Sequence, residues 1–368
     1  MSFVLIDRLE GLSLPADGPL RRDPIVPPEQ QSADYLARYD DRTLFYDAVA
    51  LGPKHVLVTA PAAFNLWDGL RRGFSWEDGS PARLFSRQRL PATELLTFRR
   101  RPGALRFRLG QIDRPVRLRE SPAAEFAGLN TLVTLSRDNP LPWIREWLDF
   151  YVRAHGLEAL VFFDNGSEAY PPEAIAETAL AAGLKAVAVY QVPFPYGITL
   201  RSPDGRRSGI LLQPSLLNLM RRDMGAQARA VLNVDIDEII RTPGDRSIFD
   251  LASESWHGMA KVHGSWVYPD PEAELPAPQH LHVRRAIPNA RCNQKWCARP
   301  NGLLSRFGWS VHFIGERLKS VAHAVPGAEL LHCRATTTGW KDTRHRIPEE
   351  TAADPDLADY FRTWLPHD

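Results

Sequence analysis

From about residue 129 onward, the chain alternates short apolar runs with amphipathic segments. Apolar runs of this kind are typical of strands that are buried on both faces of a parallel sheet. The predicted strands are Thr131–Leu135, Ala159–Phe163, Ala186–Tyr190 and Ala230–Val234. Apolar residues at helical spacing, with Pro at the start and Gly at the end, predict the helices between them: Pro142–Arg153, Pro171–Ala182 and Leu211–Arg222. The order predicts an α/β class with a Rossmann-like, mostly parallel sheet flanked by helices.

The first 127 residues have a different sequence pattern, in which apolar runs are separated by clusters of Pro, Gly and Arg. Lys54–Thr59 is one such run, and Leu105–Leu109 alternates apolar and charged residues with the period of a half-buried strand. We therefore predict a small β-rich accessory domain over residues 1–127, the α/β domain over 128–346, and a helical tail over 347–368.

Charge and composition exclude several classes of function. The 368 residues include 45 Lys and Arg against 44 Asp and Glu, so the formal net charge is +1. Without a basic surplus, nucleic acid is not an expected partner. Three cysteines do not form a disulfide scaffold and suit a reducing compartment. No secretion signal and no apolar run of about 18 residues is visible, so we expect a cytoplasmic protein whose membrane contact, if any, is peripheral at the inner face.

Three acidic residues follow the fourth predicted strand, in the segment Asp235-Ile236-Asp237-Glu238. On an extended segment alternate side chains point to one side, so Asp235 and Asp237 can present two carboxylates together. Carboxylates crowded at a strand end repel one another unless a cation lies between them, and hard oxygen ligands favour Mg²⁺ or Mn²⁺ completed by substrate phosphates. The alternative is a charged turn that caps the strand.

A second polar cluster, Asp164-Asn165-Gly166-Ser167, follows the second predicted strand. Ligands of open α/β sheets collect at the carboxyl ends of the strands, where this cluster and the acidic segment both lie. One interpretation makes it a nucleotide-binding edge in which Asp164 accepts a hydrogen bond from a base or ribose. The other is a tight connection made of turn-forming residues.

Several motifs share an order with a known group of enzymes. They are Glu146-Trp147-Leu148-Asp149-Phe150-Tyr151, His155-Gly156-Leu157, Phe163-Asp164-Asn165-Gly166-Ser167, Asp235-Ile236-Asp237-Glu238-Ile239-Ile240, Lys295-Trp296-Cys297-Ala298-Arg299-Pro300, Val311-His312-Phe313 and His332-Cys333-Arg334. Together they resemble family-92 and related family-2-like glycosyltransferases, over roughly residues 129–344. Two departures stand out: Ser136-Arg137-Asp138-Asn139 replaces an Arg-Asn-Glu or Lys-Asn-Glu segment, and Cys333 replaces a tyrosine.

The resemblance implies a GT-A fold that transfers a sugar from a nucleotide-diphosphate donor, with a UDP-sugar favoured, to a glycan or lipid-linked acceptor with inversion. A Mn²⁺ or Mg²⁺ ion would neutralise the charge that develops on the leaving diphosphate. The implied metal ligands are Asp235 and Asp237 with either His332 or His312, and a histidine bonded to backbone is the alternative for each. The implied nucleotide-binding residues are Asp164, Asn165, Gln213, Asp235 and Lys341.

An inverting transferase needs a carboxylate that takes the proton of the acceptor hydroxyl. Asp270 and Glu316 are candidates, and an exposed loop acid is the alternative for both. Three tryptophans downstream of the acids, Trp266, Trp296 and Trp309, are candidates to stack on sugar rings, with core packing as the alternative.

Two other functions fit the same sheet. A sugar-phosphate nucleotidyltransferase shares the acidic site but normally has a Gly-rich basic phosphate loop after the first strand, and Ser136–Asn139 is a poor version of one. A non-catalytic polysaccharide-binding or assembly protein would have no need to crowd Asp235 and Asp237.

Overall fold

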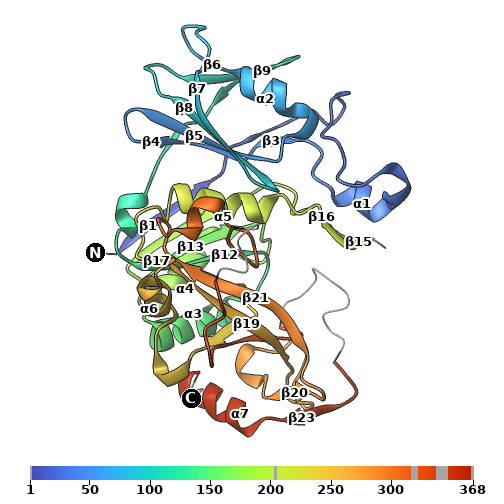
Figure 1. Cartoon of the computed structure of the whole chain (residues 1–368), viewed down its shortest axis with the longest axis vertical. Coiled ribbons are helices and arrows are strands. Elements are labelled where there is room, and N and C mark those ends of the chain that lie inside the picture. Colours follow the sequence, from blue (N-terminus) through green and yellow to red (C-terminus); the bar gives the residue numbers. More distant parts are fainter. Residues whose placement is uncertain (1, 203–204, 316–321, 337–346, 366–368) are drawn as a thin grey trace. The chain divides into compact units, whose positions relative to one another are not determined.

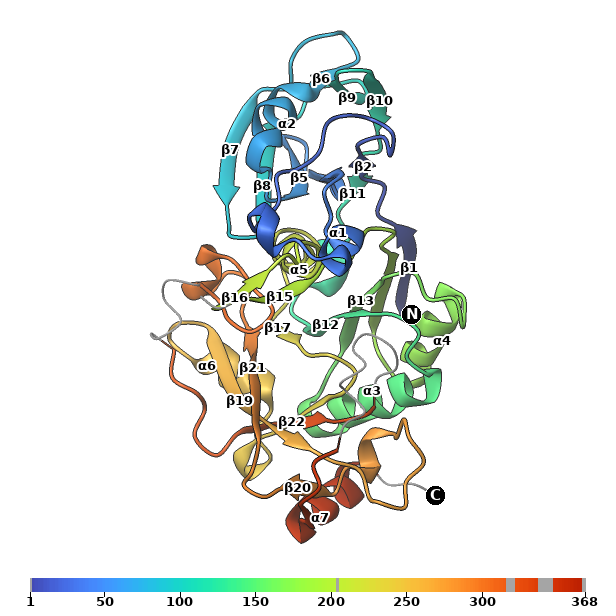
Figure 2. The same cartoon turned by 90° about the vertical axis from the view of Figure 1, so that its right-hand side faces the viewer.

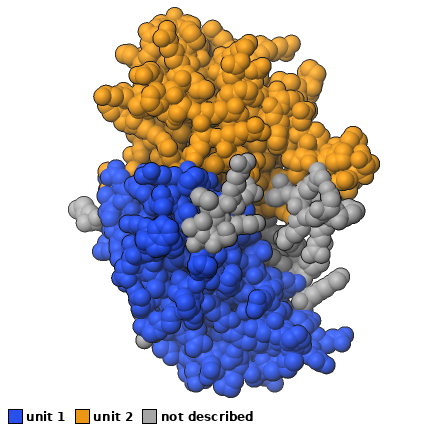
Figure 3. All heavy atoms as spheres, viewed as in Figure 1, with its two compact units in different colours: residues 1–7, 125–191, 225–368 blue, residues 8–124, 192–224 orange. Residues whose placement is uncertain are grey.

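The computed structural model describes residues 2–202, 205–315, 322–336 and 347–365. The chain forms two compact units (Figure 3). Unit 1 comprises Met1–Asp7, Glu125–Gln191 and Gly225–Asp368, and unit 2 comprises Arg8–Ala124 and Val192–Met224. Unit 2 thus draws on residues from both sides of position 127.

Unit 1 is built around a mixed sheet of nine strands in the order β1-β14-β13-β12-β17-β21-β19-β22-β18 (Figures 1 and 2). Their bounds are β1 Phe3–Arg8, β12 Asn130–Ser136, β13 Ala159–Asp164, β14 Ala186–Gln191, β17 Ala230–Asn233, β18 Glu238–Arg241, β19 Met259–Val267, β21 Arg291–Ala298 and β22 Glu329–Cys333. A separate pair joins β20 (Arg284–Ala286) to β23 (Thr351–Ala353). The expected α/β class, with a large helix-flanked sheet beside β-rich regions, is confirmed.

The strands predicted from apolar runs form the parallel part of this sheet. β12 pairs in parallel with β13 and β17, and β13 pairs in parallel with β14. Residues of β13 are buried along its whole length, which explains why the sequence shows a continuous apolar run there and no alternation. β21 continues the sheet antiparallel to β17.

The helices of unit 1 pack on one face of the sheet, where their apolar residues join those of the strands in one core. They are α3 Leu141–His155, α4 Pro172–Ala181, α6 Ile248–Glu254 and α7 Pro355–Trp364, with short 3₁₀ turns at η3 Ala123–Phe126, η4 Pro243–Asp245, η5 Gln279–Leu281 and η6 Leu304–Phe307. α3 ends as predicted at Gly156, whose φ of 65° places it in the left-handed region that favours glycine.

Unit 2 is mostly β-structure. It contains a five-stranded sheet, β11-β4-β5-β8-β7, a three-stranded sheet, β10-β9-β6, and the pairs β2-β3 and β15-β16. The bounds are β2 Leu12–Ser13, β3 Thr43–Phe45, β4 Asp47–Leu51, β5 His55–Pro61, β6 Phe74–Trp76, β7 Leu84–Arg89, β8 Thr93–Arg99, β9 Leu105–Leu109, β10 Ile112–Val116, β11 Arg119–Glu120, β15 Thr199–Ser202 and β16 Gly205–Ser208; the helices are η1 Pro28–Gln30, α1 Ala33–Arg38, η2 Phe64–Leu66, α2 Trp67–Gly73 and α5 Leu212–Arg222.

Helix α5 confirms the helix predicted over Leu211–Arg222, but it packs against β5 and β8 of unit 2. Polar contacts join it to two strands of the five-stranded sheet: Ser215 Oγ lies 3.1 Å from Thr93 Oγ1 of β8, and Arg221 donates to Gln88 Oε1 of β7 at 2.7 Å. Among the described residues, no helix is long and apolar enough to cross a membrane.

Candidate functional site

The candidate site lies where the strand order of the unit 1 sheet changes direction. From β12 the chain moves to β13 and β14 on one side, and it later returns to β17 on the other side of β12 (Figure 2). Open α/β sheets bind ligands outside the carboxyl ends of the strands at such a point. Here β12 leads into residues 137–140, and β17 leads into residues 234–238. We call residues 234–238 the acidic loop.

The acidic loop is a tight turn. The backbone N of Asp235 donates to Glu238 Oε2 at 2.8 Å, and the backbone N of Glu238 donates to Asp235 O at 3.1 Å. The extended alternation expected across Asp235 and Asp237 therefore does not continue beyond β17, because the chain bends to enter β18. As a result the two aspartates have different main partners.

Asp235 shares a cation with Glu238. The ammonium of Lys295, on β21, lies 2.9 Å from Asp235 Oδ2 and 2.9 Å from Glu238 Oε2. The Lys295 and Glu238 side chains are 0% and 1% exposed, whereas that of Asp235 is 29% exposed. Burial opposes the charge on Lys295, but the two carboxylates outweigh it and raise the lysine pKa. Burial also raises the pKa of Glu238, which Lys295 opposes. Asp235 is thus the acid of this trio that reaches solvent.

Asp237 pairs with the histidine of the last core strand. His332 Nε2 lies 3.2 Å from Asp237 Oδ2, and its Nδ1 lies 3.5 Å from Glu238 Oε1. The register explains this contact, because β18 runs antiparallel to β22 with Glu238 opposite His332. Trp266 of β19 covers the imidazole, with ring centroids 4.1 Å apart. The fold therefore brings His332, one of the two predicted histidines, to the acidic loop.

Three elements fix the backbone of the acidic loop. From α3, Trp147 Nε1 and the Tyr151 hydroxyl both donate to the carbonyl of Glu238, at 3.3 and 3.0 Å. From η5, the buried Gln279 donates to the carbonyl of Ile236 at 2.8 Å. From β22, the backbone N of Cys333 donates to the carbonyl of Asp237 at 2.7 Å. The aromatic residues of the Glu146–Tyr151 motif thus hold the acids in place.

The Asp237–His332 pair fits a divalent ion that arrives with a phosphate ligand. Within the described ranges, no three His, Cys, Asp or Glu side chains gather as a ready-made metal site. Asp237 Oδ2 and His332 Nε2 offer one carboxylate oxygen and one imidazole nitrogen. Mg²⁺ is commonly bound through one or two carboxylates with the remaining ligands supplied by water and substrate phosphates. The donor set therefore suits an ion carried by a diphosphate.

His312 has partners other than Asp237. Its Nδ1 lies 3.2 Å from the carbonyl of Gln294, to which it donates, so in the neutral ring Nε2 accepts from Asn293 Nδ2 at 3.1 Å. Burial, reinforced by the nearby charge of Lys295, lowers the pKa of His312 to about 4. The ring is neutral at physiological pH and is held by one side-chain amide and one backbone carbonyl of β21.

Asp164 and Asn165 form the turn after β13. Asp164 is buried and accepts from the backbone N of Ser167 at 3.0 Å, and the backbone N of Asn165 donates to Ser136 O at 2.9 Å. Asp138 joins the neighbouring loops by accepting from the backbone N of Glu168 and Ala169. These contacts are those of a tight connection between β13 and α4, and the nucleotide-binding role of this turn stays a prediction.

Two further candidates make contacts with residues outside the acidic loop. Asp270 caps a turn after β19, where Oδ1 accepts from the backbone N of Glu272 at 2.9 Å. Gln213 belongs to α5 in unit 2, where Oε1 accepts from the Tyr196 hydroxyl at 3.1 Å. Glu316 and Lys341 lie outside the described residues.

Of the three tryptophans considered for sugar stacking, two belong to the core. Trp296 and Trp309 are fully buried and pack on each other with centroids 4.9 Å apart. Trp266 is partly exposed and packs on His332, so it is the tryptophan that borders the site.

Lys295 is the residue that the sequence did not connect with the acids. Its motif was visible, but no role followed from it. A signal was available: lysine is scarce in this chain, with 6 among 45 cationic residues, and this one directly precedes the apolar segment Trp296-Cys297-Ala298. Lysine is almost never fully buried unless it is paired, so a lysine in a core strand indicates a nearby carboxylate.

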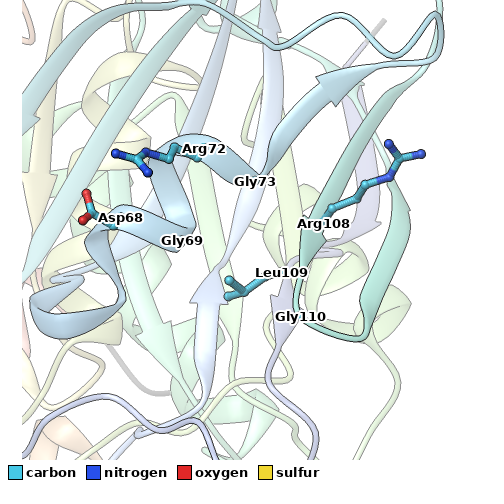
Figure 4. Close-up of a pocket in the computed structure, with 7 residues that line it drawn as sticks. All are labelled: Asp68, Gly69, Arg72, Gly73, Arg108, Leu109 and Gly110. Atoms are coloured by element: carbon cyan, nitrogen blue, oxygen red, sulfur yellow. The ribbon is translucent and has the colours of Figure 1, made fainter.

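A separate hollow of about 390 Å³ lies in unit 2, between α2 and the end of β9 (Figure 4). The helix approaches the strand so closely there that a Cβ added to Gly69 would lie 2.7 Å from Leu109 Cδ1. Its lining residues are Asp68, Gly69, Arg72, Gly73, Arg108, Leu109 and Gly110. None of the predicted site residues lines it.

No family model and no curated protein matches the sequence. Solved structures that resemble the chain include two of S. aureus TarS 1–349, one of them in complex with UDP. They share 16% and 14% sequence identity with it, each at a TM-score of 0.29, and each match covers 57% of this chain. The chain spans 59% of the TarS chains that it matches.

Proposed function

We propose that the chain is a glycosyltransferase that uses a nucleotide-diphosphate sugar, with a UDP-sugar favoured, as its donor. The observation that carries this proposal is the position of the acidic loop. It follows β17 beside β12, where the strand order changes direction, and it presents one partly exposed carboxylate, Asp235, next to the Asp237–His332 pair. Sites of this kind in open α/β sheets are suited to nucleotide ligands.

The donor places two chemical groups at this edge of the sheet. Its ribose presents hydroxyls, for which the partly exposed Asp235 carboxylate is a suitable acceptor. Its diphosphate becomes more negative as the sugar leaves, and it needs positive charge nearby. We propose that Mn²⁺ or Mg²⁺, held by Asp237 and His332, supplies that charge when bound.

The acceptor is proposed to be a glycan or a lipid-linked sugar, reached from the cytoplasm. Trp266 borders His332 and is partly exposed, so it is placed to pack against a sugar ring. For inverting transfer we retain Asp270 and Glu316 as proposed proton acceptors. The turn contact of Asp270 through Oδ1 leaves its other carboxylate oxygen for that role.

The decisive experiment measures donor turnover with Mn²⁺ across a panel of nucleotide sugars, for the wild type and for Asp237→Ala. We expect one donor to be hydrolysed or transferred, and the variant to lose about 100-fold or more of that activity, the order of effect of removing one preorganised electrostatic group. Asp359→Ala is the matched control, because Asp359 is an exposed acid on α7 of the same unit.

Two outcomes would contradict the proposal. If no nucleotide sugar binds and Asp237→Ala changes only stability, the chain is a binding or assembly protein. If the chain instead forms a nucleotide sugar from a nucleoside triphosphate and a sugar phosphate, it is a nucleotidyltransferase.

A further inference from the structure

We infer that unit 2 carries a membrane-docking surface, which binds the headgroup layer of a bilayer that contains anionic lipids. We call this surface the basic end. It comprises Lys54 and His55 where β5 begins, Arg83, Leu84 and Phe85 where β7 begins, and Arg99 where β8 ends. The inference goes beyond the proposed function, because these residues belong to unit 2 and docking on a bilayer needs no nucleotide.

The two units differ in charge, although the whole chain is nearly neutral. Unit 2 has 24 Lys and Arg against 16 Asp and Glu, a formal net charge of +8, whereas unit 1 has 21 against 28, a net charge of −7. The overall charge of +1 therefore conceals one basic unit and one acidic unit. A basic unit attracts anionic partners, over about 8–10 Å at moderate salt concentration.

Backbone hydrogen bonds bring the cations of the basic end together from three segments of the chain. The backbone N of Arg99 donates to Arg83 O at 3.1 Å, and the backbone N of Arg100 donates to Lys54 O at 2.9 Å. His55 lies opposite Arg99 across β5 and β8. Because β5, β8 and β7 are successive neighbours in the five-stranded sheet (Figures 1 and 2), the fold fixes these residues at one end of it.

Three cations of the basic end are exposed and have no acidic partner. Within the described ranges, the side chains of Lys54, Arg83 and Arg99 form no ion pair with a carboxylate, and all three residues are exposed. The neighbouring Arg100 differs, since its Nη2 lies 3.1 Å from Glu120 Oε1. Exposed cations of this kind are attracted to an anionic membrane surface by about 1 kcal/mol each.

Two adjacent apolar side chains are exposed beside these cations. Leu84 is 38% exposed and Phe85 is 54% exposed. The register of β7 against β8 shifts between Leu84 and Ser86, so Phe85 is the extra residue of a bulge. Cations alone would protect β7, an edge strand, from pairing with other strands, but exposed apolar residues do the opposite. The combination indicates a ligand that offers both an apolar layer and negative charge.

The surroundings of the Phe85 ring favour a bilayer over a nucleic acid or a glycan. The His55 ring packs on it with centroids 4.8 Å apart, and Arg99 Cζ lies 5.1 Å from its centroid. These groups occupy ring surface that a base or a sugar would need for stacking. The exposed part of the ring and the aliphatic Leu84 can instead enter the boundary between headgroups and acyl chains, while the cations stay at the phosphates.

The test measures cosedimentation of the full chain with lipid vesicles, in the absence of nucleotide. Vesicles with about one-third phosphatidylglycerol should bind the chain at least about tenfold more tightly than pure phosphatidylcholine vesicles, and should release it as the salt concentration rises. Arg99→Gln should weaken binding to the anionic vesicles about fivefold, which corresponds to about 1 kcal/mol. Phe85→Ser should weaken it about tenfold, because the ring no longer enters the boundary.

Controls separate docking from folding and from net charge. Arg38→Gln removes the same charge from an arginine that is 44% exposed on α1, outside the five-stranded sheet, and should change vesicle binding less than about twofold. Leu84→Ser is a second apolar variant, used where Phe85→Ser does not fold, and it should also weaken binding. The thermal midpoint of each variant is recorded beside its affinity.

Several results would overturn the inference. They are equal binding to neutral and anionic vesicles, equal effects of Arg99→Gln and Arg38→Gln, or folded Phe85→Ser and Leu84→Ser variants that bind as the wild type does. Tighter binding of single-stranded RNA or of a soluble anionic polysaccharide than of vesicles would assign the basic end to that partner instead. Failure of the proposed function looks different, because a chain that uses no nucleotide sugar can still bind vesicles through the basic end.

Discussion

Each unit of the molecule buries a cluster of charges, and the two clusters differ in how they meet solvent. In unit 2, Arg119 on β11 donates to Asp47 from Nε at 2.9 Å and from Nη2 at 2.6 Å, and it also contacts Asp223. All three side chains are buried. In unit 1, Lys295 holds the buried Glu238 and the partly exposed Asp235. One cluster is closed, and the other has a face open to solvent.

The two clusters therefore differ in whether a ligand could reach their charges. The closed cluster joins β11 and β4 to Asp223 at the end of α5, so it links the two sequence segments that form unit 2. Burial raises the pKa of Asp47, and Arg119 opposes that shift. Such a cluster can stabilise a fold but cannot receive a ligand. The open cluster lies at the carboxyl end of a strand and keeps one acid accessible.

The sharpest way to break this comparison is Arg119→Met. Removing the cation leaves Asp47 and Asp223 buried and uncompensated, so we expect a loss of about 3–5 kcal/mol in the free energy of unfolding. Chemical denaturation monitored by tryptophan fluorescence measures it. UDP affinity of the folded fraction should not change, because Asp47 and Asp223, which Arg119 contacts, belong to unit 2 and not to the acidic loop.

Arg114→Met is the control for that substitution, since Arg114 is an exposed arginine on β10 of the same unit. It should leave the unfolding midpoint almost unchanged. An equal loss in both variants, or a loss of nucleotide binding in Arg119→Met alone, would contradict a purely structural closed cluster.

A second experiment compares buried and accessible charges through the pH dependence of stability, using a buried histidine of unit 1. His155 is buried, contacts Ile240 O at 2.8 Å and accepts from Ile248 N at 3.2 Å. Burial lowers its pKa to about 4. The unfolded chain, with a histidine pKa of about 6.5, binds the proton more readily, so stability is full above about pH 6.5 and is lost as pH falls towards 4. We expect a loss on the order of 3 kcal/mol from this residue.

Denaturation curves collected between pH 7 and 4 test this expectation. His155→Gln should flatten the dependence of stability on pH, whereas the same change at the exposed His323 should leave it as in the wild type. If the free energy of unfolding depends on pH equally in the wild type and in His155→Gln, then a group other than His155 causes the loss of stability in acid.

The smallest effect on stability is expected for a charge pair that is not buried and does not belong to the candidate site. Arg145 and Asp149 form an i,i+4 pair on α3 at 2.8 Å, with both side chains partly exposed. Asp149→Asn should change the free energy of unfolding by less than about 0.5 kcal/mol and leave UDP affinity unchanged. A larger change in either quantity would show that exposure is a poor guide to the role of a charge in this protein.

Local periodicity made most of the unit 1 core predictable. The strand expected over Thr131–Leu135 is β12, Asn130–Ser136, and the helix expected over Pro142–Arg153 is α3, Leu141–His155. What periodicity could not supply is the partner of each apolar face. The pattern of α5 shows that a face is buried, and only the tertiary fold shows that β5 and β8 cover it.

Part of the candidate site was also predictable from the sequence, and part depended on the tertiary fold. The acidic loop was predictable because three acids at the end of an apolar strand conflict with burial unless a cation is near. Which of the two histidines, His312 or His332, lies beside Asp237 was not predictable, because this depends on the register that puts Glu238 opposite His332 across β18 and β22. Lys295 was missed because its contact with Asp235 crosses from β21 to the acidic loop, 60 residues apart in the chain.

The excursion of the chain into unit 2 at Val192–Met224 has a consequence for how the protein can be divided. Cutting the chain near residue 125 would not release two independent modules. The N-terminal piece would lack α5, and the C-terminal piece would carry an apolar helix whose buried residues, Leu212, Leu216, Leu219 and Met220, had lost β5 and β8. A gene fusion or truncation that treats residues 1–124 as a detachable cassette would therefore create an aggregation-prone surface on the remainder.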